Sequence, residues 1–379
     1  MFQQFSAIIR NTFFESIRQP IMLVVLFVAT LLIILSNPLS AFTMADDQRM
    51  LIDIGLATVF LCGALLAAFI ATNVLGREIE NRTALTVISK PVSRPVFVLG
   101  KYLGVAAALA VGTAYMSFVF LLVERHSVLQ TVRDPVNVPV IVFGLGAGIL
   151  GLAVGVWCNY FYGKVFSSTV ICVTTPLAGI AYFLSMMFRP DFALQPIANG
   201  WKPQIWLALV GLLVSILVLT AIAVAASTRL GQVMTLAITV GMFVLGMLSD
   251  WLFGLHIANM KNDWLQEASA AGKTEIVKRT QTVHLTNGEI NEITNDVEIP
   301  KDGGSLLDFA STEEKIEYAL CWTGYSILPN FQALWLSDAV TQGHVIPIRY
   351  IASTALYGLC YIGATLSLAV FLFQRREVG

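Results

Sequence analysis

The residues that could bind a nucleotide phosphate come first, because phosphate binding leaves a strict sequence pattern. A phosphate-binding loop has the spacing GxxxxGK[ST], in which backbone amides and the lysine hold the phosphates. Gly100-Lys101 comes nearest to it, but Pro95 stands where the first glycine is needed. We therefore expect no catalytic residues for nucleotide hydrolysis in this chain, and no bound ATP or Mg.

A second glycine pattern, Gly146 to Gly151, formally matches the dinucleotide fingerprint GxGxxG. It lies inside an apolar run with no preceding strand, so dinucleotide binding is rejected. The better interpretation is close helix packing through two small-xxx-small pairs. These pairs are Gly144 with Gly148 and Gly151 with Gly155. Packing within the chain and packing against a second copy both remain open.

Histidines and cysteines give no metal or disulfide pattern. The residues concerned are His126, His256, His284, His344, Cys62, Cys158, Cys172, Cys321 and Cys360. They show no CxxC pair and no ligand spacing, so metal binding is the weaker alternative to ordinary loop and core positions. The basic residues are spread thinly along loops, and nucleic-acid binding has no support.

The one long polar segment in the first half of the chain is residues 76–104. It holds Arg77, Arg82, Lys90, Arg94 and Lys101 against Glu78 and Glu80. Glu78 and Arg82 stand four residues apart, as a helical ion pair requires. Pro91 would end that helix, and Pro95 would open the next one in its first turn. A solvated loop and a docking element for another protein both fit these features.

Long apolar runs surround this segment and predict the fold. Of 379 residues 56% are hydrophobic and 12% charged, about half the charge of a soluble domain. Runs that could cross a membrane lie at about 20–37, 51–75, 98–123, 138–158, 165–188, 204–227, 232–255 and 348–373. A span needs about 20 apolar residues. The first run is short and Pro176 interrupts the fifth, so six to eight spans are expected and eight favoured, in an all-α polytopic membrane protein.

The two ends of the chain are predicted to lie on one side of the membrane. Residues 1–19 form an amphipathic pattern suited to an interfacial helix, with a cleaved signal peptide as the rival interpretation. With the N-terminus inside, the inner basic residues are Arg10, Arg18, Arg77, Arg82, Lys90, Arg94, Lys101, Lys164, Arg229, Arg375 and Arg376. The outer short loops hold Arg49, Arg125, Arg133, Arg189 and Lys202. This asymmetry predicts cytoplasmic termini.

Residues 256–345 differ from the rest, because they contain more than half of the 24 acids. Thr282 to Leu285 and Ile290 to Ile299 flank Asn287-Gly288, which predicts a hairpin with a tight turn. Ser311, with Glu314 three residues on, predicts a capped helix start. We expect four parts: an interfacial helix 1–19, a transmembrane domain 20–255, a small α+β extracytoplasmic insert 256–345, and a last span with a cytoplasmic tail 346–379.

The polar segment and the chain's end resemble a known family, the permease subunits of type-2 ATP-binding-cassette (ABC) exporters. The residues that bear the resemblance are Glu78-Ile79-Glu80-Asn81-Arg82-Thr83, Ser89-Lys90-Pro91-Val92-Ser93-Arg94, Gly100-Lys101, Leu328-Pro329-Asn330-Phe331 and Phe373-Gln374-Arg375-Arg376-Glu377. The match covers about residues 1–125 and 325–379. Between these ranges only the pattern of spans agrees.

The resemblance implies a bacterial inner-membrane permease that pairs with a second copy or a paralogue and sits on separate ATPase subunits, which bind ATP and Mg. The cytoplasmic loop 76–98 would then be the element that the ATPase pushes. Its implied coupling residues are Glu78, Glu80, Arg82, Thr83, Lys90, Pro91, Ser93 and Arg94. The acidic insert 256–345 departs from the compact members of the family and offers a surface for an extracytoplasmic partner.

Two other functions remain open at this point. An ion-coupled carrier would need ionisable or broken-helix sites at the membrane midplane, and no clear one is visible. Asp53, Glu124, Arg125 and Asp250 fall near predicted span ends, where burial costs little. A membrane scaffold would act through the outer insert. The substrate is not encoded in any pattern of the sequence.

Overall fold

The computed structural model describes residues 2–43, 46–80, 93–129, 135–285, 290–301 and 305–374. The chain divides into two compact units. The helical unit comprises residues 1–240 and 349–379, and the insert unit comprises residues 241–348. Each unit is described separately below.

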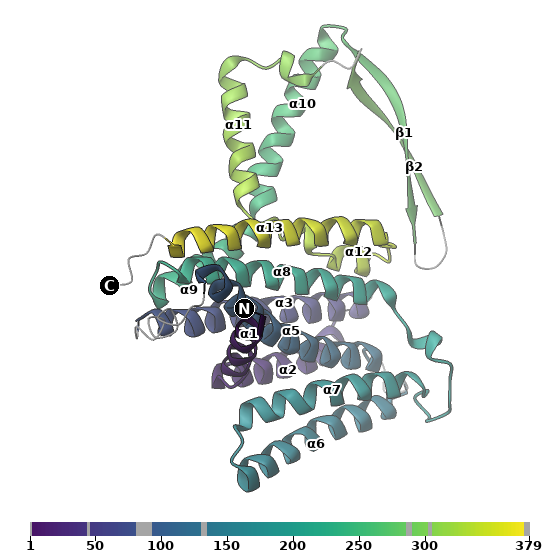
Figure 1. The fold of residues 1–379 in the computed structure, drawn as a ribbon. Helices are drawn as coiled ribbons and strands as arrows, with labels where there is room; N and C mark the ends of the chain where they lie inside the picture. Colours follow the sequence, from purple (N-terminus) through teal and green to yellow (C-terminus); the bar gives the residue numbers. More distant parts are fainter. Residues whose placement is uncertain are drawn as a thin grey trace. The chain divides into compact units, whose positions relative to one another are not determined.

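The helical unit is built from long, apolar helices (Figure 1). Its helices are α1 (Phe2–Ile17), α2 (Pro20–Ser40), α3 (Asp47–Glu80), α5 (Arg94–His126), α6 (Val138–Tyr162), α7 (Phe166–Met186), η1 (Ile197–Gly200), α8 (Pro203–Ser227), α9 (Gln232–Met247), which continues into the insert unit, and α13 (Ile348–Gln374). Among the described residues, α2, α3, α5, α6, α7, α8 and α13 are seven helices long and apolar enough to cross a membrane. An eighth span results if α9 and Asp250–Ala270, bent by 50°, count as one. The predicted all-α polytopic membrane fold is confirmed.

Proline sets the start of several of these helices. Pro20, Pro95, Pro139 and Pro203 each stand in the first turn, where the missing N–H would have no partner in any case. The predicted helix start at Pro95 is confirmed. α6 ends at Gly163, whose φ of 60° is the left-handed conformation that glycine adopts without strain.

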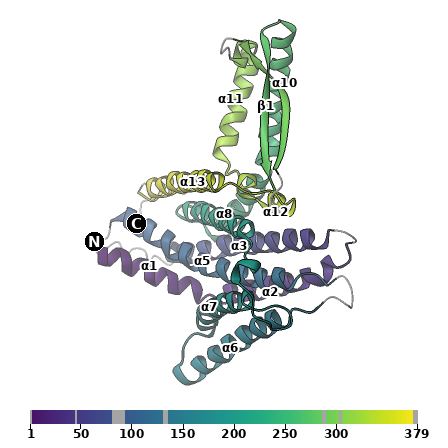
Figure 2. The ribbon, with the colours of Figure 1, turned by 90° about the vertical axis from the view of Figure 1, so that its right-hand side faces the viewer.

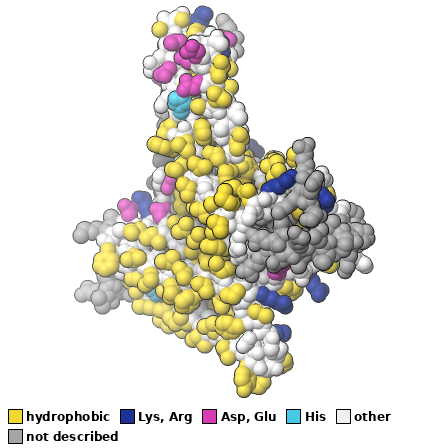
Figure 3. Space-filling model, turned by 90° about the vertical axis from the view of Figure 1, so that its left-hand side faces the viewer, with side chains coloured by type: hydrophobic (Ala, Val, Ile, Leu, Met, Phe, Trp, Pro, Cys, Tyr) yellow, Lys and Arg dark blue, Asp and Glu magenta, His cyan; other side chains and the backbone are white. Residues whose placement is uncertain are grey.

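Burial separates central helices from peripheral ones. In α3 and α8, 72% of the most apolar stretch is buried, against only 22% in α6. α6 and α7 lie side by side at one edge of the unit in both views (Figures 1 and 2). Hydrophobic side chains cover much of the face of the helical unit seen in Figure 3. Such a surface suits hydrocarbon rather than water as the solvent.

The insert unit contains a helix pair and a two-stranded sheet. Its elements are the end of α9, the π-helical stretch η2 (Asp250–Gly254), α10 (Leu255–Ala270), β1 (Thr274–His284), β2 (Ile290–Pro300), η4 (Leu306–Asp308), α11 (Thr312–Ile327), η5 (Gln332–Leu334) and α12 (Ser337–Thr341). β1 and β2 pair antiparallel from Thr274–Pro300 to His284–Ile290. Acidic side chains gather on this unit (Figure 3).

The predicted hairpin and helix cap of the insert are both confirmed. The first strand starts eight residues before the predicted one, because residues 274–281 pair through their backbones without an apolar pattern. The turn at Asn287-Gly288 lies outside the described residues. Ser311 caps α11: its N–H donates to Glu314 Oε2 at 2.7 Å, and Glu314 N–H donates to Ser311 Oγ at 3.3 Å.

A small core holds α10 to the segment before α11. Met260, Trp264 and Ala310 are buried together. Leu306, Phe309 and Tyr318 pack around them. This cluster gives the hairpin a folded neighbour, which an isolated two-stranded sheet needs to be stable in water.

Candidate functional site

The predicted coupling residues fall at two helix ends and in the segment between them. Glu78 and Glu80 belong to the last turn of α3, and Ser93 and Arg94 begin α5. Arg82, Thr83, Lys90 and Pro91 lie outside the described residues. We call the end of the helical unit at which α5 begins the Arg94 end.

Arg94 binds the end of a distant helix. Its Nη1 donates to Gln374 O at 2.6 Å and lies 3.5 Å from Phe373 O, at the last turn of α13. Arg229, just after α8, donates through Nε to Leu372 O at 2.9 Å. Two guanidinium groups therefore satisfy carbonyls that a helix C-terminus leaves open, and their charge suits its dipole.

The next turns of α5 pack against α1 with almost no space between the backbones. A Cβ on Gly104 would lie 2.5 Å from Thr12 Cβ and 2.8 Å from Ile9 O, and a Cβ on Gly100 would lie 2.8 Å from Ile8 Cγ2. Only glycine fits at this distance. α5, which follows the predicted coupling segment, is therefore in close backbone contact with α1.

An ion pair between a buried lysine and a partly exposed glutamate reinforces this contact. Lys101, only 3% exposed, lies with its Nζ 3.3 Å from Glu15 Oε2 of α1. The same ammonium stands 5.9 Å from the centre of the Phe97 ring. An ammonium inside a membrane helix is costly without such partners.

Further hydrogen bonds join more helices at the Arg94 end. Ser167 Oγ donates to Arg18 O at 2.9 Å and links α7 to the segment after α1. Gln232 Nε2 donates to Asn73 Oδ1 and links α9 to α3. These hydrogen bonds connect the helix ends next to the predicted coupling segment.

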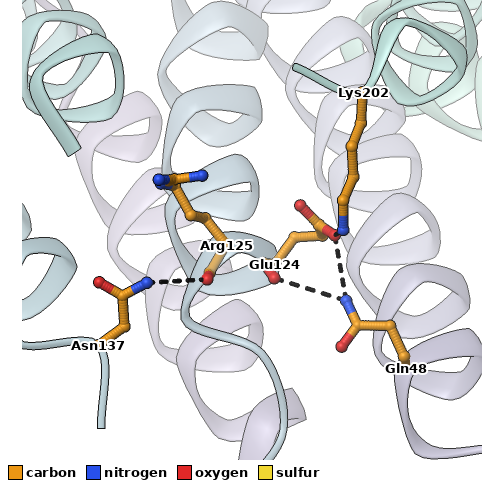
Figure 4. Close-up of polar contacts among 5 residues, drawn as sticks. All are labelled: Gln48, Glu124, Arg125, Asn137 and Lys202. Carbon is orange, nitrogen blue, oxygen red and sulfur yellow. Dashed lines mark hydrogen bonds and ion pairs between the residues drawn. The ribbon is translucent and has the colours of Figure 1, made fainter. Parts of the chain in front are cut away.

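The opposite end of α5 carries a second polar cluster, which we call the Glu124 end (Figure 4). Glu124 is 3% exposed, and its carboxylate forms an ion pair with Lys202, the residue before α8. Gln48 of α3 donates through Nε2 to Glu124 Oε1 at 3.1 Å. Sequence reasoning placed Glu124 where burial costs little. The structure buries it fully, and Lys202 and Gln48 offset the cost.

Arg125 organises the loops beside this pair. Its Nη2 donates to Ser185 O at 2.9 Å and to Phe188 O at 3.2 Å, at the end of α7. Its carbonyl accepts from Asn137 Nδ2 at 3.3 Å, and Asn137 Oδ1 accepts from Val140 N–H and so caps α6. The two consecutive residues Glu124 and Arg125 therefore connect the ends of α3, α5, α6, α7 and α8.

α5 is the element that both clusters share. Its 33 residues span about 50 Å at 1.5 Å per residue, enough to cross the membrane. Arg94 and Lys101 lie near its start, and Glu124 and Arg125 near its end. The Arg94 end and the Glu124 end are therefore joined by one continuous helix.

The two predicted glycine pairs behave differently. A Cβ on Gly151 would lie 2.3 Å from Thr174 Oγ1, and one on Gly155 would lie 2.4 Å from Val170 Cγ2, so this pair packs against α7 of the same chain. A Cβ on Gly148 would meet nothing within 4 Å, and one on Gly144 only Leu122 at 3.7 Å. Gly144 and Gly148 therefore leave open space beside α6.

Sequence reasoning missed two features that it had the signals to find. Gly100 and Gly104 form a small-xxx-small pair beside Lys101, the same pattern that was recognised at Gly144. The charged dipeptide Glu124-Arg125 ends one span, and Lys202 precedes another. Opposite charges at neighbouring span ends are candidates for pairing.

His256 makes an ordinary side-chain contact. His256 Nε2 lies 2.9 Å from Glu317 Oε1 within the insert unit. No group of three or more His, Cys, Asp or Glu side chains is placed to hold a metal ion in the described ranges.

Comparison with known proteins gives one match. Residues 16–232, more than half of the chain, match the sequence model of the family described as ABC-2 family transporter protein. The matched region contains the segment 76–98, all of α5 and the Glu124 end, whereas Glu15 and the α13 partners of Arg94 and Arg229 lie outside it. No curated protein and no solved structure matches the chain.

Proposed function

Because the chain belongs to the ABC-2 transporter family and is a multi-pass permease of that type, we propose that it is the membrane-spanning subunit of an exporter driven by a separate ATPase. Two permeases, identical or paralogous, would form the substrate pathway. ATP and Mg would bind in the partner subunits, and this chain would hydrolyse nothing itself.

The observation that supports coupling most strongly is the way α5 begins. Its first turn binds the end of α13 through Arg94, and its next turns are fixed to α1 through Gly104 and Lys101. A force applied to residues 76–98 would move three helices as one body. A loosely attached loop would absorb the same force by bending.

The proposed contact surface for the ATPase is the set of polar residues around that loop. Its members are Glu78, Glu80, Arg82, Thr83, Lys90, Pro91, Ser93 and Arg94. Their excess of positive charge also supports a cytoplasmic Arg94 end and cytoplasmic termini, in a bacterial inner membrane. The Glu124 end then faces outward. Residues 256–345 are proposed to be extracytoplasmic and would meet any extracytoplasmic partner.

In this proposal the nucleotide cycle shifts a two-state equilibrium. Closure of the ATPase displaces the Arg94 end, and α5 transmits the displacement to the Glu124 end. There Glu124 holds Lys202, and Arg125 holds the end of α7, so these contacts bias the resting state. Substrate leaves when they rearrange.

The test is purification of the tagged, full-length chain from its native membranes in mild detergent. We expect an ABC ATPase to co-purify, and we expect Glu78→Arg or Arg82→Glu to uncouple its hydrolysis from conformational change in the permease. Arg189→Glu is the matched control, because Arg189 is exposed at the opposite end of the helical unit.

Each alternative predicts a different result. A transport-competent chain without any ATPase would refute the proposal. Transport that stops when an ion gradient collapses while ATP stays high would indicate an ion-coupled carrier. If deletion of the insert abolished function while Glu78→Arg and Arg82→Glu left it intact, the chain would be a scaffold.

A further inference from the structure

A cavity of about 560 Å³ lies among α2, α5, α6 and α7. This volume falls in the range of about 300–1,000 Å³ found for small-molecule sites. Its walls are mainly apolar, with Ile34, Val119 and Leu152 among them. The cavity contains neither the proposed coupling residues nor the Glu124 carboxylate.

The polar groups inside this cavity are already hydrogen-bonded. Thr30 Oγ1 donates to Leu26 O at 2.8 Å and lies 3.0 Å from the Tyr115 hydroxyl, which donates to it. Thr174 Oγ1 donates to Val170 O at 2.6 Å. The hydroxyl protons of all three residues are used within the protein, so an occupant finds no free donor at these groups, and the mainly apolar interior favours hydrocarbon over water.

A second cavity of about 200 Å³ extends the first. Both are lined by Thr30, Tyr115 and Gly148, and the smaller one reaches Leu23 near the start of α2. From Leu23 to Asn37 the groove follows α2 for about 21 Å, at 1.5 Å per residue. Half of the bilayer's hydrocarbon core is about 15 Å thick. The groove is therefore long enough for one acyl chain of a single leaflet.

The mouth of the groove is polar and lies at the Glu124 end. Asn37 and His126 line the larger cavity there, and Asn37 Nδ2 donates to Ser127 O at 2.8 Å. Along its side the groove is open to the surface, because Leu145 and Ile149 of α6 line it and are 59% and 67% exposed. In a membrane that surface is in contact with lipid.

We propose that this groove binds one acyl chain of a membrane glycerophospholipid. The acyl chain packs against Gly148 and Leu152, and the lipid headgroup lies beside Asn37 and His126. The open side at α6 gives the chain a lateral entrance from the bilayer. The proposal goes beyond the function proposed above, since it needs neither an ATPase nor a direction of transport.

The test uses the full-length chain, without any ATPase, in vesicles of phosphatidylcholine and phosphatidylglycerol. The vesicles contain a phosphatidylcholine with a diazirine in one acyl chain, and labelled peptides are mapped after irradiation. Gly148→Leu fills the groove, and its backbone has room for a side chain. Gly146→Leu is the matched control, because Gly146 has the same free space but does not line the groove.

We expect labels on α2, α6 and α7, reduced at least fivefold by Gly148→Leu and unchanged by Gly146→Leu. Equal labelling of the two variants, or labels spread evenly over all lipid-facing helices, would overturn the proposal. A photoreactive residue in place of Leu145 gives an independent result. An adduct with lipid supports the acyl-chain site, and an adduct with a second copy of the chain or with another protein contradicts it.

Discussion

The ion pair between Glu124 and Lys202 makes a quantitative prediction for Lys202→Met. The Glu124 side chain is 4% exposed and that of Lys202 is 55% exposed. Breaking a fully buried pair costs about 3–5 kcal/mol, and breaking an exposed pair about 0–1 kcal/mol. Because one partner is half exposed, we expect a loss of about 2 kcal/mol in the free energy of unfolding. Gln48 would remain near Glu124, but it brings no charge.

A double-mutant cycle separates this pair from general damage at the helix ends. Glu124→Gln removes the charge but keeps the shape and an oxygen for Gln48 to bind. In that background Lys202→Met should cost less than about 0.5 kcal/mol, which gives a coupling of about 1.5 kcal/mol. Thermal unfolding in detergent should show the single Lys202→Met variant melting on the order of 4 °C lower.

The control for this cycle is another ion pair of the same helical unit. Arg49 and Asp46 lie 3.1 Å apart with side chains 59% and 64% exposed. Arg49→Met should change the free energy of unfolding by less than about 0.5 kcal/mol. If Lys202→Met and Glu124→Gln are additive, or if Lys202→Met costs no more than Arg49→Met, the pair does not hold the Glu124 end.

Three further predictions concern other contacts. Gly104→Ala should separate α1 from α5 and lower the free energy of unfolding by about 1–3 kcal/mol, because the new Cβ would lie 2.5 Å from Thr12 Cβ. The control Gly146→Ala should leave that free energy unchanged, because a Cβ there meets nothing within 4 Å. Equal effects of the two variants in thermal unfolding would contradict the close packing. Arg94→Ala should remove about 1 kcal/mol from the last turn of α13 and speed its amide hydrogen exchange, and unchanged exchange there would refute the contact. Ser311→Ala should cost about 0.5–2 kcal/mol and speed exchange at the start of α11. Hydrogen bonds from the backbone and hydroxyl of Ser311 lower the pKa of Glu314 from its ordinary 4.5, so this cap is complete at neutral pH and is lost as the pH falls below 4.5. Protection factors at the start of α11 that do not decrease when the pH falls below 4.5 would contradict that role.

Local patterns predicted the elements of this fold well. Prolines at helix starts, such as Pro95, mark boundaries because they act within one turn of the chain. The capping box at Ser311 is recognisable because both of its bonds join residues three apart. The hairpin around Asn287-Gly288 was predicted for the same reason, although backbone pairing made its strands longer than the apolar pattern indicated.

Contacts between distant segments could not be predicted in the same way. Glu15 and Lys101 are separated by more than 80 residues, and nothing in either segment specifies the other. Arg94 was recognised as basic and near a helix start, but its bond to Gln374 depends on where α13 ends in space. Gly148 was recognised in the sequence as part of a small-xxx-small pair. The cavity beside it could not be predicted, because four separate helices form its walls.

Residues 76–98 are proposed to contact an ATPase. The most direct test of this contact places a photoreactive residue at Arg82 in the full-length chain, irradiates native membranes, and identifies the adduct by mass spectrometry. We expect an adduct with an ABC ATPase subunit whose yield changes when ATP is added, and none from the same residue placed at Arg189. An Arg82 adduct confined to lipid, or equal ATPase adducts from both positions, would contradict it.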